Sequence, residues 1–492
     1  MKLRLPLICA VCALLTACAV GPDYQRPVAL RSQPVPAAFA GDWKTAEPAA
    51  HLPRGAWWEV FGDADLNRLE RAATSDNEGL AAAVARYRQA AALVDVARAD
   101  FLPQISFQGS VVKQRTSQNA PQSGHPAGQA YTFNTYTAPV VMGWEPDLWG
   151  RIRRQTEAAG ARLTASADDV ESVKLAIQGA VAVDYFALRS FDAELMVVAD
   201  TIETYRRSLE LTRNRRKGGV VSDLDVSQAE TQLRTAETQL PFLQLERVKL
   251  ADALAALCGQ PATTFTVASD RARLKPPPGL PPTLPGVLLE RRPDIATAER
   301  LMAAANADIG VAKSAFYPRL VFNGLGGFQS ISAGTVFNWP SRIWAIGPTV
   351  DIPLFTGGRL TAQLAGVRAS YDETVANYRQ TVLGAFQEVE DQLAAQKLLA
   401  AQLDAETAAL VSARRTQDIA NNRYRAGLVT YLEVATAQSA AFDRERAVVV
   451  LQGERCVATV GLIKALGGGW DGNVGVSSAQ VGSGKEDRTR PQ

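Results

Sequence analysis

Hydrophobic residues recur at helical spacing over one very long stretch in the C-terminal half of the chain. Their steps alternate between three and four residues and average about 3.67, the eleven-residue repeat of a straight or slightly right-handed coil. From Gly358 to the turn before Thr430 there is room for roughly seventy helical residues, or on the order of 100 Å. A helix of this length must pack beside other long helices. The stripe consists of Leu360, Leu364, Val367, Tyr371, Val375, Tyr378, Val382, Phe386, Val389 and Leu393.

Four shorter segments have the character of β-strands. Residues 105–111 alternate between apolar and polar side chains, and residues 320–324 do so less cleanly. Residues 131–135 and 344–351 are expected as the return strands, with polar loops such as 118–124 between them. Alternating strands with polar loops are typical of membrane β-barrels. A dimeric coiled-coil rod, which the long helices alone would allow, is therefore disfavoured.

The sequence contains an internal duplication. Residues 216–226 match residues 424–434 at an offset of 208 residues. Upstream, residues 99–103 match residues 314–318 at an offset of 215, so the first copy carries an inserted loop. Each copy has the same order of elements: a helix, strand segments, one very long helix, a glycine-containing turn and a returning helix.

The number of strands predicts an oligomer. Each copy supplies one hairpin, so the chain supplies four strands, and open edges in hydrocarbon would leave backbone groups unsatisfied at several kcal/mol each. The smallest outer-membrane barrels have about eight strands. Two chains would give eight strands around a filled interior, and three would give twelve strands with space for a lumen; both arrangements stay open.

Composition narrows the class of function. The formal net charge of the 492 residues is +2, so no strong field points to nucleic acid. Outside the first twenty residues no apolar run is long enough for a membrane-spanning helix, so a membrane would have to be crossed by β-strands. Residues 324–327 are too short for a dinucleotide-binding loop. With two histidines and no nucleophile motif, we expect no metal site, no cofactor and no enzymatic activity.

Cysteine usage is uneven along the chain. Cys9, Cys12 and Cys18 crowd the N-terminus, whereas Cys258 and Cys456 stand alone. The last two are interpreted as small buried apolar residues on helices, with a disulfide between them as the alternative.

The N-terminus has the features of a processing signal. Lys2 and Arg4 precede an apolar stretch, residues 5–15, of signal-peptide length. It ends in Leu15-Thr16-Ala17-Cys18, which resembles a bacterial lipobox, where the cysteine is lipidated and becomes the first residue of the mature chain. In that class alanine rather than aspartate after the cysteine, as in Ala19, points to the outer membrane. The alternative is an ordinary signal peptide that happens to meet a cysteine.

These patterns predict an organisation in two repeats. We expect a lipoprotein signal peptide over 1–17, a lipid-anchored extended segment over 18–60, repeat 1 over 61–259, a Pro-rich linker over 260–290, repeat 2 over 291–467 and a disordered tail over 468–492. The β-hairpins are expected at about 104–147 and 319–355, and the tips of the helical hairpins at 218–222 and 427–430.

Four segments, in this order, give the chain a specific resemblance. They are Gly21-Pro22-Asp23-Tyr24-Gln25-Arg26-Pro27, Trp57-Trp58-Glu59-Val60-Phe61, Leu288-Leu289-Glu290-Arg291-Arg292-Pro293-Asp294-Ile295 and Ile309-Gly310-Val311-Ala312-Lys313-Ser314-Ala315-Phe316-Tyr317-Pro318. From Cys18 to about Trp470 the chain resembles the TolC-like outer-membrane factors of tripartite efflux pumps. The resemblance is strongest to the lipoprotein branch that serves resistance-nodulation-division (RND) pumps.

The resemblance implies an α+β membrane protein that forms a trimer. Three chains would supply four strands each to one twelve-stranded barrel in the outer membrane, and their helical hairpins would form a periplasmic tunnel. The two tips would contact a periplasmic adaptor (membrane-fusion) protein. The tip residues concerned are Gly219, Val220, Ser222, Leu224, Gly427, Leu428, Thr430 and Leu432.

The resemblance also implies a gate at the tips. Acidic residues just after each tip and a tyrosine just before one correspond here to Asp225, Glu433 and Tyr424. Relatives often carry a further aspartate where this chain has Thr436, which puts a complete acidic ring in doubt. The alternative is that Asp225 and Glu433 are carboxylates at helix N-termini, where the helix dipole favours them.

The expected function is a passive exit duct for drugs or other small toxic compounds across the outer membrane. Its expected partners are two further copies of itself, the adaptor, an inner-membrane RND transporter and outer-membrane lipid, without nucleic acid. A protein-secretion duct shares this fold, and a non-channel periplasmic scaffold lipoprotein is the alternative from another class. The lipobox and Arg291-Arg292-Pro293-Asp294 favour efflux.

Overall fold

The computed structural model describes residues 19–27, 55–119, 130–270, 274–278 and 292–468. The predicted signal peptide, Cys18, residues 271–273 and 279–290 of the predicted linker and the tail from residue 469 lie outside these residues. The chain divides into two compact units. Unit 1 comprises residues 1–50, 74–177 and 282–390, and unit 2 comprises residues 51–73, 178–281 and 391–492.

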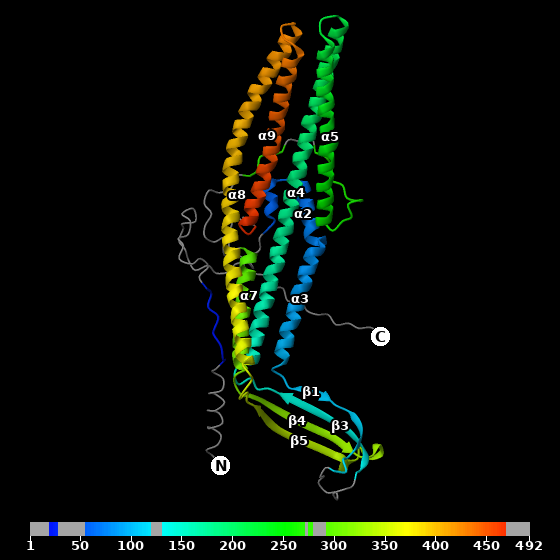
Figure 1. Ribbon diagram of the computed structural model, residues 1–492, viewed down its shortest axis with the longest axis vertical. Coiled ribbons are helices and arrows are strands. Elements are labelled where there is room, and N and C mark those ends of the chain that lie inside the picture. The colour runs from blue at the N-terminus through cyan, green and yellow to red at the C-terminus, as the bar shows by residue number, and fades with distance from the viewer. Residues whose placement is uncertain (1–18, 28–54, 120–129, 271–273, 279–291, 469–492) are drawn as a thin grey trace. The chain divides into compact units, whose positions relative to one another are not determined.

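Four helices form two matched pairs (Figure 1). α4 (Arg151–Lys217) and α8 (Arg359–Arg425) have 67 residues each. α5 (Asp223–Leu257) and α9 (Tyr431–Ala465) return from them with 35 residues each. Every bound in the second copy lies 208 residues after its counterpart in the first. The predicted very long helices and the predicted duplication are confirmed.

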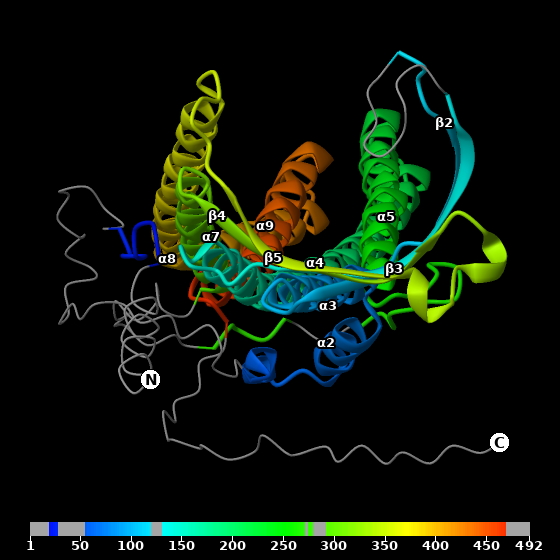
Figure 2. The same ribbon diagram turned by 90° about the horizontal axis from the view of Figure 1, so that it is seen from below.

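The apolar stripe predicted along α8 is the packed side of that helix. All of its positions from Leu360 to Leu393 are buried or half-buried. In unit 1, Tyr378 and Val382 share an apolar cluster with Met302 of α7 (Pro293–Ser314). α7 lies beside α8 in both views (Figure 1 and Figure 2). In the first copy its counterpart is α3 (Glu78–Ala99), at the offset of 215 residues.

Residues 57–60, expected in the extended N-terminal segment, instead form the 3-10 helix η2 (Trp57–Phe61) together with Phe61 of the predicted repeat 1. In an extended chain, neighbouring side chains point to opposite faces. The helical turn allows Trp57 and Trp58 to be buried together, with ring centroids 5.9 Å apart. The Trp57 indole N–H also donates to Gln178 Oε1 at 3.3 Å. In unit 2 this turn precedes α2 (Ala64–Asp76).

The strands form one antiparallel sheet within unit 1 (Figure 1). β3 (Thr132–Trp144) pairs on one side with β1 (Gln104–Phe107) and β2 (Ser110–Arg115), and on the other with β4 (Arg319–Ser330). β4 pairs in turn with β5 (Arg342–Asp351), after the short 3-10 turns η3 (Ala333–Thr335) and η4 (Trp339–Ser341).

The strand expected over 105–111 is interrupted at Gln108-Gly109, which corrects the sequence prediction. The interruption does not shift the register: Phe107 faces Val140, and Ser110 faces Thr137 three residues further along. β1 and β2 therefore act as one edge of the sheet.

The sheet has one mostly apolar face and a second, more polar face, called the polar face below, which also carries Val141, Val321 and Leu325. The register places the odd-numbered residues of β1 and β2 on the same face as the even-numbered residues of β3, β4 and β5. This apolar face carries a stacked pair, Trp144 and Phe322, with centroids 5.9 Å apart. Its other large members are Ile105, Phe107, Val140, Met142, Leu320, Trp344, Ile346 and Val350. The opposite face includes Gln104, Ser106, Asn323, Gln329, Thr349 and Asp351.

Residues 19–27 lie as an extended strap against unit 1. The Tyr24 hydroxyl donates to Glu299 Oε1 at 2.7 Å. Gly21 has φ +120°, and a Cβ on it would come within 2.5 Å of the Gly310 Cα, so the strap and α7 meet through two glycines. The Gly-Pro-Asp-Tyr segment that carried the resemblance is thus fixed by close backbone packing.

Cys258 and Cys456 are both buried and free, so the disulfide alternative is wrong. Over the described part of the chain, no helix combines the length and the apolar character needed to span a membrane.

Candidate functional site at the helical tips

The two tips of unit 2 share one backbone geometry. After α4, Gly219 adopts φ +75°, and the Val220 N–H donates to the Arg215 carbonyl at 2.9 Å, which closes a Schellman turn. Only a residue without a Cβ takes this conformation without strain. The second tip repeats the turn with Gly427 (φ +77°), Leu428 and Arg423 at 3.0 Å. It begins at Ala426, one residue earlier than expected.

Both tips expose apolar side chains at matching positions. Val220 corresponds to Leu428 and Leu224 to Leu432 at the 208-residue offset, and all four are exposed. Exposed apolar groups thus recur at the same place in both copies.

Asp225 closes a capping box at the start of α5. Its Oδ2 accepts from the Ser222 N–H at 2.9 Å, and its own N–H donates to Ser222 Oγ at 3.3 Å. Its Oδ1 accepts from the Tyr431 N–H of the second tip at 3.4 Å. Partial burial would raise the pKa of Asp225, but these hydrogen bonds outweigh it and hold the pKa below its usual value. Within one chain Asp225 is both a helix cap and a link between the tips.

Tyr424 is buried between the two helical hairpins, with 3% of its surface exposed. Its hydroxyl donates to Thr212 Oγ1 at 3.3 Å, and its ring meets the Tyr431 ring edge-on with centroids 5.7 Å apart. The Arg215 guanidinium lies 4.7 Å from the Tyr424 ring centroid and donates to the Tyr424 carbonyl at 2.6 Å. The Tyr424 carbonyl also accepts from the Gly427 N–H at 2.9 Å, and Arg215 Nη1 donates to the Arg425 carbonyl as well, at 3.1 Å. Arg215 therefore adds a donor to the last carbonyls of α8.

The copies differ in their chemistry at the positions of Tyr424 and Tyr431. In the first copy, Arg216 and Asp223 form an exposed ion pair across the turn, with Nε and Oδ1 2.7 Å apart. The equivalent residues of the second copy, 208 positions later, are Tyr424 and Tyr431. An exposed salt bridge is thus replaced by a buried aromatic contact that holds the second tip against the first.

Glu433 has a different environment from Asp225. It has the spacing of a capping box with Thr430, but the Thr430 side chain makes no cap hydrogen bond. Glu433 is exposed, and its Oε2 lies 4.0 Å from Arg423 Nη1. Thr436 is exposed too, and its hydroxyl donates to the Leu432 carbonyl at 2.9 Å.

Of the three predicted gate residues, the structure brings Asp225 and Tyr424 together at Tyr431, while Glu433 contacts Arg423 instead. Sequence reasoning missed Arg215 and Tyr431. The substitution of a tyrosine for Asp223 of the first copy could have drawn attention to Tyr431, because the surrounding residues match.

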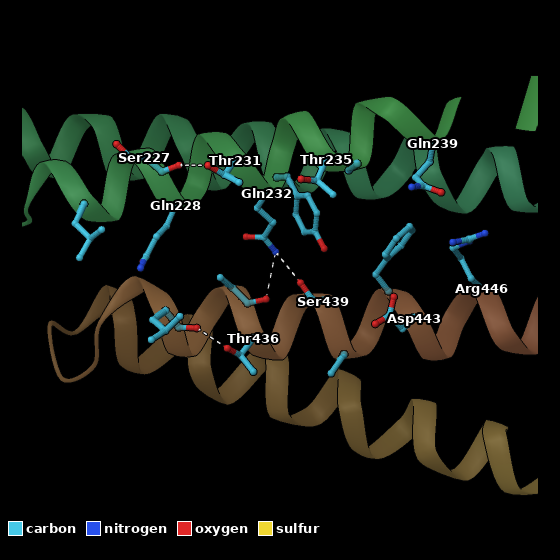
Figure 3. Close-up of a pocket in the computed structure, with 17 residues that line it drawn as sticks. Ser227, Gln228, Thr231, Gln232, Thr235, Gln239, Thr436, Ser439, Asp443 and Arg446 are labelled. Atoms are coloured by element: carbon cyan, nitrogen blue, oxygen red, sulfur yellow. Dashed lines mark hydrogen bonds between the residues drawn. The ribbon is translucent and has the colours of Figure 1, made fainter. Parts of the chain in front are cut away.

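A groove with a volume of about 950 Å³ runs between α5 and α9 below the tips (Figure 3). The Gln232 side chain reaches across it from α5 and donates to the Ala435 carbonyl at 3.2 Å, while accepting from the Tyr431 hydroxyl at 3.0 Å. Its other labelled lining residues are mostly uncharged and polar. They include Ser227, Gln228, Thr231, Thr235, Gln239 and Ser439, with Asp443 and Arg446 at one end.

Comparison with known proteins agrees with this architecture. A family model described as outer membrane efflux protein matches residues 69–260 and 284–468. The solvent efflux pump outer membrane protein SrpC of Pseudomonas putida is 32% identical over 459 residues, which cover 93% of this chain and 96% of SrpC.

Solved structures show the same fold. The outer-membrane channel OprN superimposes with a TM-score of 0.82 at 30% identity, covering 92% of this chain and all of OprN (100%). The outer membrane protein VceC from Vibrio cholerae gives a TM-score of 0.76 at 29% identity, covering 86% of this chain and 100% of VceC. The resemblance and the fold class predicted from the sequence are confirmed, and the chain belongs to the outer membrane efflux protein family.

Proposed function

We propose that this protein is the outer-membrane exit duct of a tripartite RND efflux pump for drugs or other small toxic compounds. The observation that carries the proposal is the duplicated architecture: 67-residue helices attached to a sheet with two unpaired edges, a fold shared with outer-membrane channels. The name of SrpC as part of a solvent efflux pump supports the same class of cargo. The duct is passive, and an inner-membrane transporter supplies the energy.

Three copies complete the duct. One chain contributes four strand positions, namely β1 with β2, then β3, β4 and β5. Three chains give a ring of twelve, which satisfies both edges of every sheet, and their long helices surround the passage that continues it.

The tips and the groove beside them receive the adaptor protein. Val220, Leu224, Leu428 and Leu432 supply exposed apolar contacts, and the groove supplies amide and hydroxyl groups that can donate or accept. A polar groove flanked by apolar knobs suits a helical hairpin with complementary side chains.

The tips also form the gate. The links that hold the hairpins of one chain together at the tips include Arg215, which donates to the Tyr424 carbonyl, and Asp225, which accepts from the Tyr431 N–H. Opening requires the tips to separate, which breaks such links. The exposed Glu433 carboxylate, 4.0 Å from Arg423 Nη1, contributes charge at the constriction.

Lipidation at Cys18 tethers the N-terminus to the membrane. A Cβ on Gly150 would lie 2.8 Å from the Ala19 Cα, and the Val20 N–H donates to the Trp149 carbonyl at 3.0 Å. The residue after Cys18 is thereby held beside the start of α4, close to the end of β3. An acyl group there would enter the bilayer next to the sheet.

The function predicts that a strain lacking this protein accumulates more of a fluorescent efflux substrate such as ethidium and becomes more susceptible to toxic compounds. Re-expression should restore both properties, and the purified protein should conduct ions in planar bilayers. Loss of protein secretion with normal susceptibility would indicate a secretion duct instead, and absence of any conductance would indicate a scaffold.

The gate predicts that Asp225→Ala combined with Glu433→Ala raises the resting conductance in planar bilayers. Because Asp225→Ala also removes a helix cap worth about 1 kcal/mol, thermal unfolding is measured in parallel. Asp225→Asn is the matched control, since its amide oxygen can keep the cap while the charge is lost. A resting conductance equal to that of the wild type in the double variant removes the gate assignment.

The adaptor surface predicts that Leu224→Glu with Leu432→Glu weakens binding of the purified adaptor. Burial of one leucine is worth about 1.5–3 kcal/mol, so we expect a loss of about tenfold or more in affinity per residue. Leu224→Met with Leu432→Met should bind normally, and the conductance of the isolated channel should stay unchanged in both variants. Equal adaptor affinities for the Glu and Met variants would contradict this surface.

Lipidation predicts that radiolabelled palmitate is incorporated into the wild type and not into Cys18→Ser. Mass spectrometry of the mature N-terminus should show an acylated Cys18. A cleaved chain with a free Cys18 thiol would instead identify an ordinary signal peptide. Cys18→Ser should retain the fold if it reaches the outer membrane, because the strap contacts begin at Ala19.

A further inference from the structure

The sheet of one chain ends in two edges, β5 on one side and β1 with β2 on the other. This inference rests on the proposed trimer, in which β5 of one chain meets β1 and β2 of the neighbouring chain. We propose that they pair in one defined antiparallel register, in which Thr349 faces Ser110 of the neighbouring chain and Ile352 faces its Phe107. The internal duplication of the chain determines this register.

The duplication preserves strand pairing residue by residue. In the first copy Gln104 faces Gly143. Adding the offset of 215 to the first residue and 208 to the second gives Arg319 and Asp351, which face each other in the second copy. The two hairpins therefore have the same register. An offset of 215 converts positions of β1 and β2 into positions of β4, and an offset of 208 converts positions of β3 into positions of β5.

The pairing of β3 with β4 joins the first copy to the second inside one chain. There Val141 faces Leu325, and Trp144 faces Phe322. A closed ring also needs a join between chains, in which β5 from the second copy of one chain pairs with β1 and β2 from the first copy of the neighbouring chain. The same offsets convert these pairs into Thr349 facing Ser110 and Ile352 facing Phe107.

The two faces of the sheet test the register independently. The apolar face uses even-numbered residues of β5 and odd-numbered residues of β1 and β2. The proposed register pairs even with odd throughout, so the apolar face continues across the join, with Pro348 facing Val111. If the register slipped by one residue, the polar face of one chain would lie on the same side of the sheet as the apolar face of the next chain.

Side chains at the join fit this pairing. Ile352 and Phe107 are 52% and 66% exposed in one chain, and they occupy the positions of the stacked pair Trp144 and Phe322. On the polar face the join sets the Thr349 hydroxyl opposite the Ser110 hydroxyl. Trp344 faces Arg115 near the hairpin end of the sheet, where a guanidinium can lie on an indole.

The backbone shows which pairs at the join lie closest. The N–H groups of Gln108 and Thr116 donate across to β3 and to Tyr131, so even-numbered residues here turn their backbone inward. The odd-numbered residues of β2 turn theirs to the free edge. Pairs through Ser110 and Gln114 are consequently non-hydrogen-bonded, with Cα atoms about 4.5 Å apart, within reach of a disulfide. Pro348 lacks an N–H, so this ladder has one bond fewer.

Cysteine cross-linking in the intact protein tests the register. Ala345→Cys with Gln114→Cys, a directly facing pair on the polar face, should form an intersubunit disulfide on mild oxidation. Covalent dimers and trimers should then appear on non-reducing gels. Each single variant gives the background, and the native Cys258 and Cys456 are buried.

Two off-register variants serve as controls. Ala345→Cys with Val112→Cys, and Ala345→Cys with Thr116→Cys, place the cysteines two residues out of register, about 7–8 Å apart, and should cross-link poorly. A trimer in which an off-register pair cross-links better than Ala345→Cys with Gln114→Cys would overturn the register and leave the exit duct intact. A monomer without conductance in native mass spectrometry and bilayers would overturn both.

Discussion

The unpaired edges of the sheet are the constraint on which the rest of the structure depends. In the part of the chain that the structure describes, β5 and the β1–β2 edge each present backbone donors and acceptors without a strand beside them. In hydrocarbon such groups cost several kcal/mol each, so the chain is complete only when another copy supplies the missing strand. The internal duplication makes this simple, because the join between chains can repeat the join between β3 and β4 that each chain already contains.

The long helices of the two copies also match in unit 2, but the side chains of the two copies differ at the tips. Backbone turns at Gly219 and Gly427 are alike, and exposed apolar residues recur at matched positions. The ion pair of the first copy is replaced by Tyr424 and Tyr431 in the second. The divergence therefore lies where adaptor binding and gating are proposed.

Much of the fold was predictable because it rests on local spacing. The stripe from Leu360 to Leu393 fixes the buried side of α8, since apolar residues at steps of three and four share one helical face. The offsets of 208 and 215 residues, read from the sequence, relate the bounds of each helix in the first copy to those of its counterpart in the second. The break at Gln108-Gly109 and the turn at Trp57 were not predictable, because both depend on packing rather than on alternation.

The sequence by itself determined the family, the duplication and the position of both tips. The spacing of apolar residues, the glycines and prolines at the ends of helices, and the four segments that carry the resemblance were sufficient for that. Only the tertiary structure decided which tip residues meet across the hairpins: Asp225 reaches Tyr431, Tyr424 is buried, and Arg215 donates to the Tyr424 carbonyl at the end of α8. These contacts join residues about two hundred positions apart, and no local pattern encodes which of them meet.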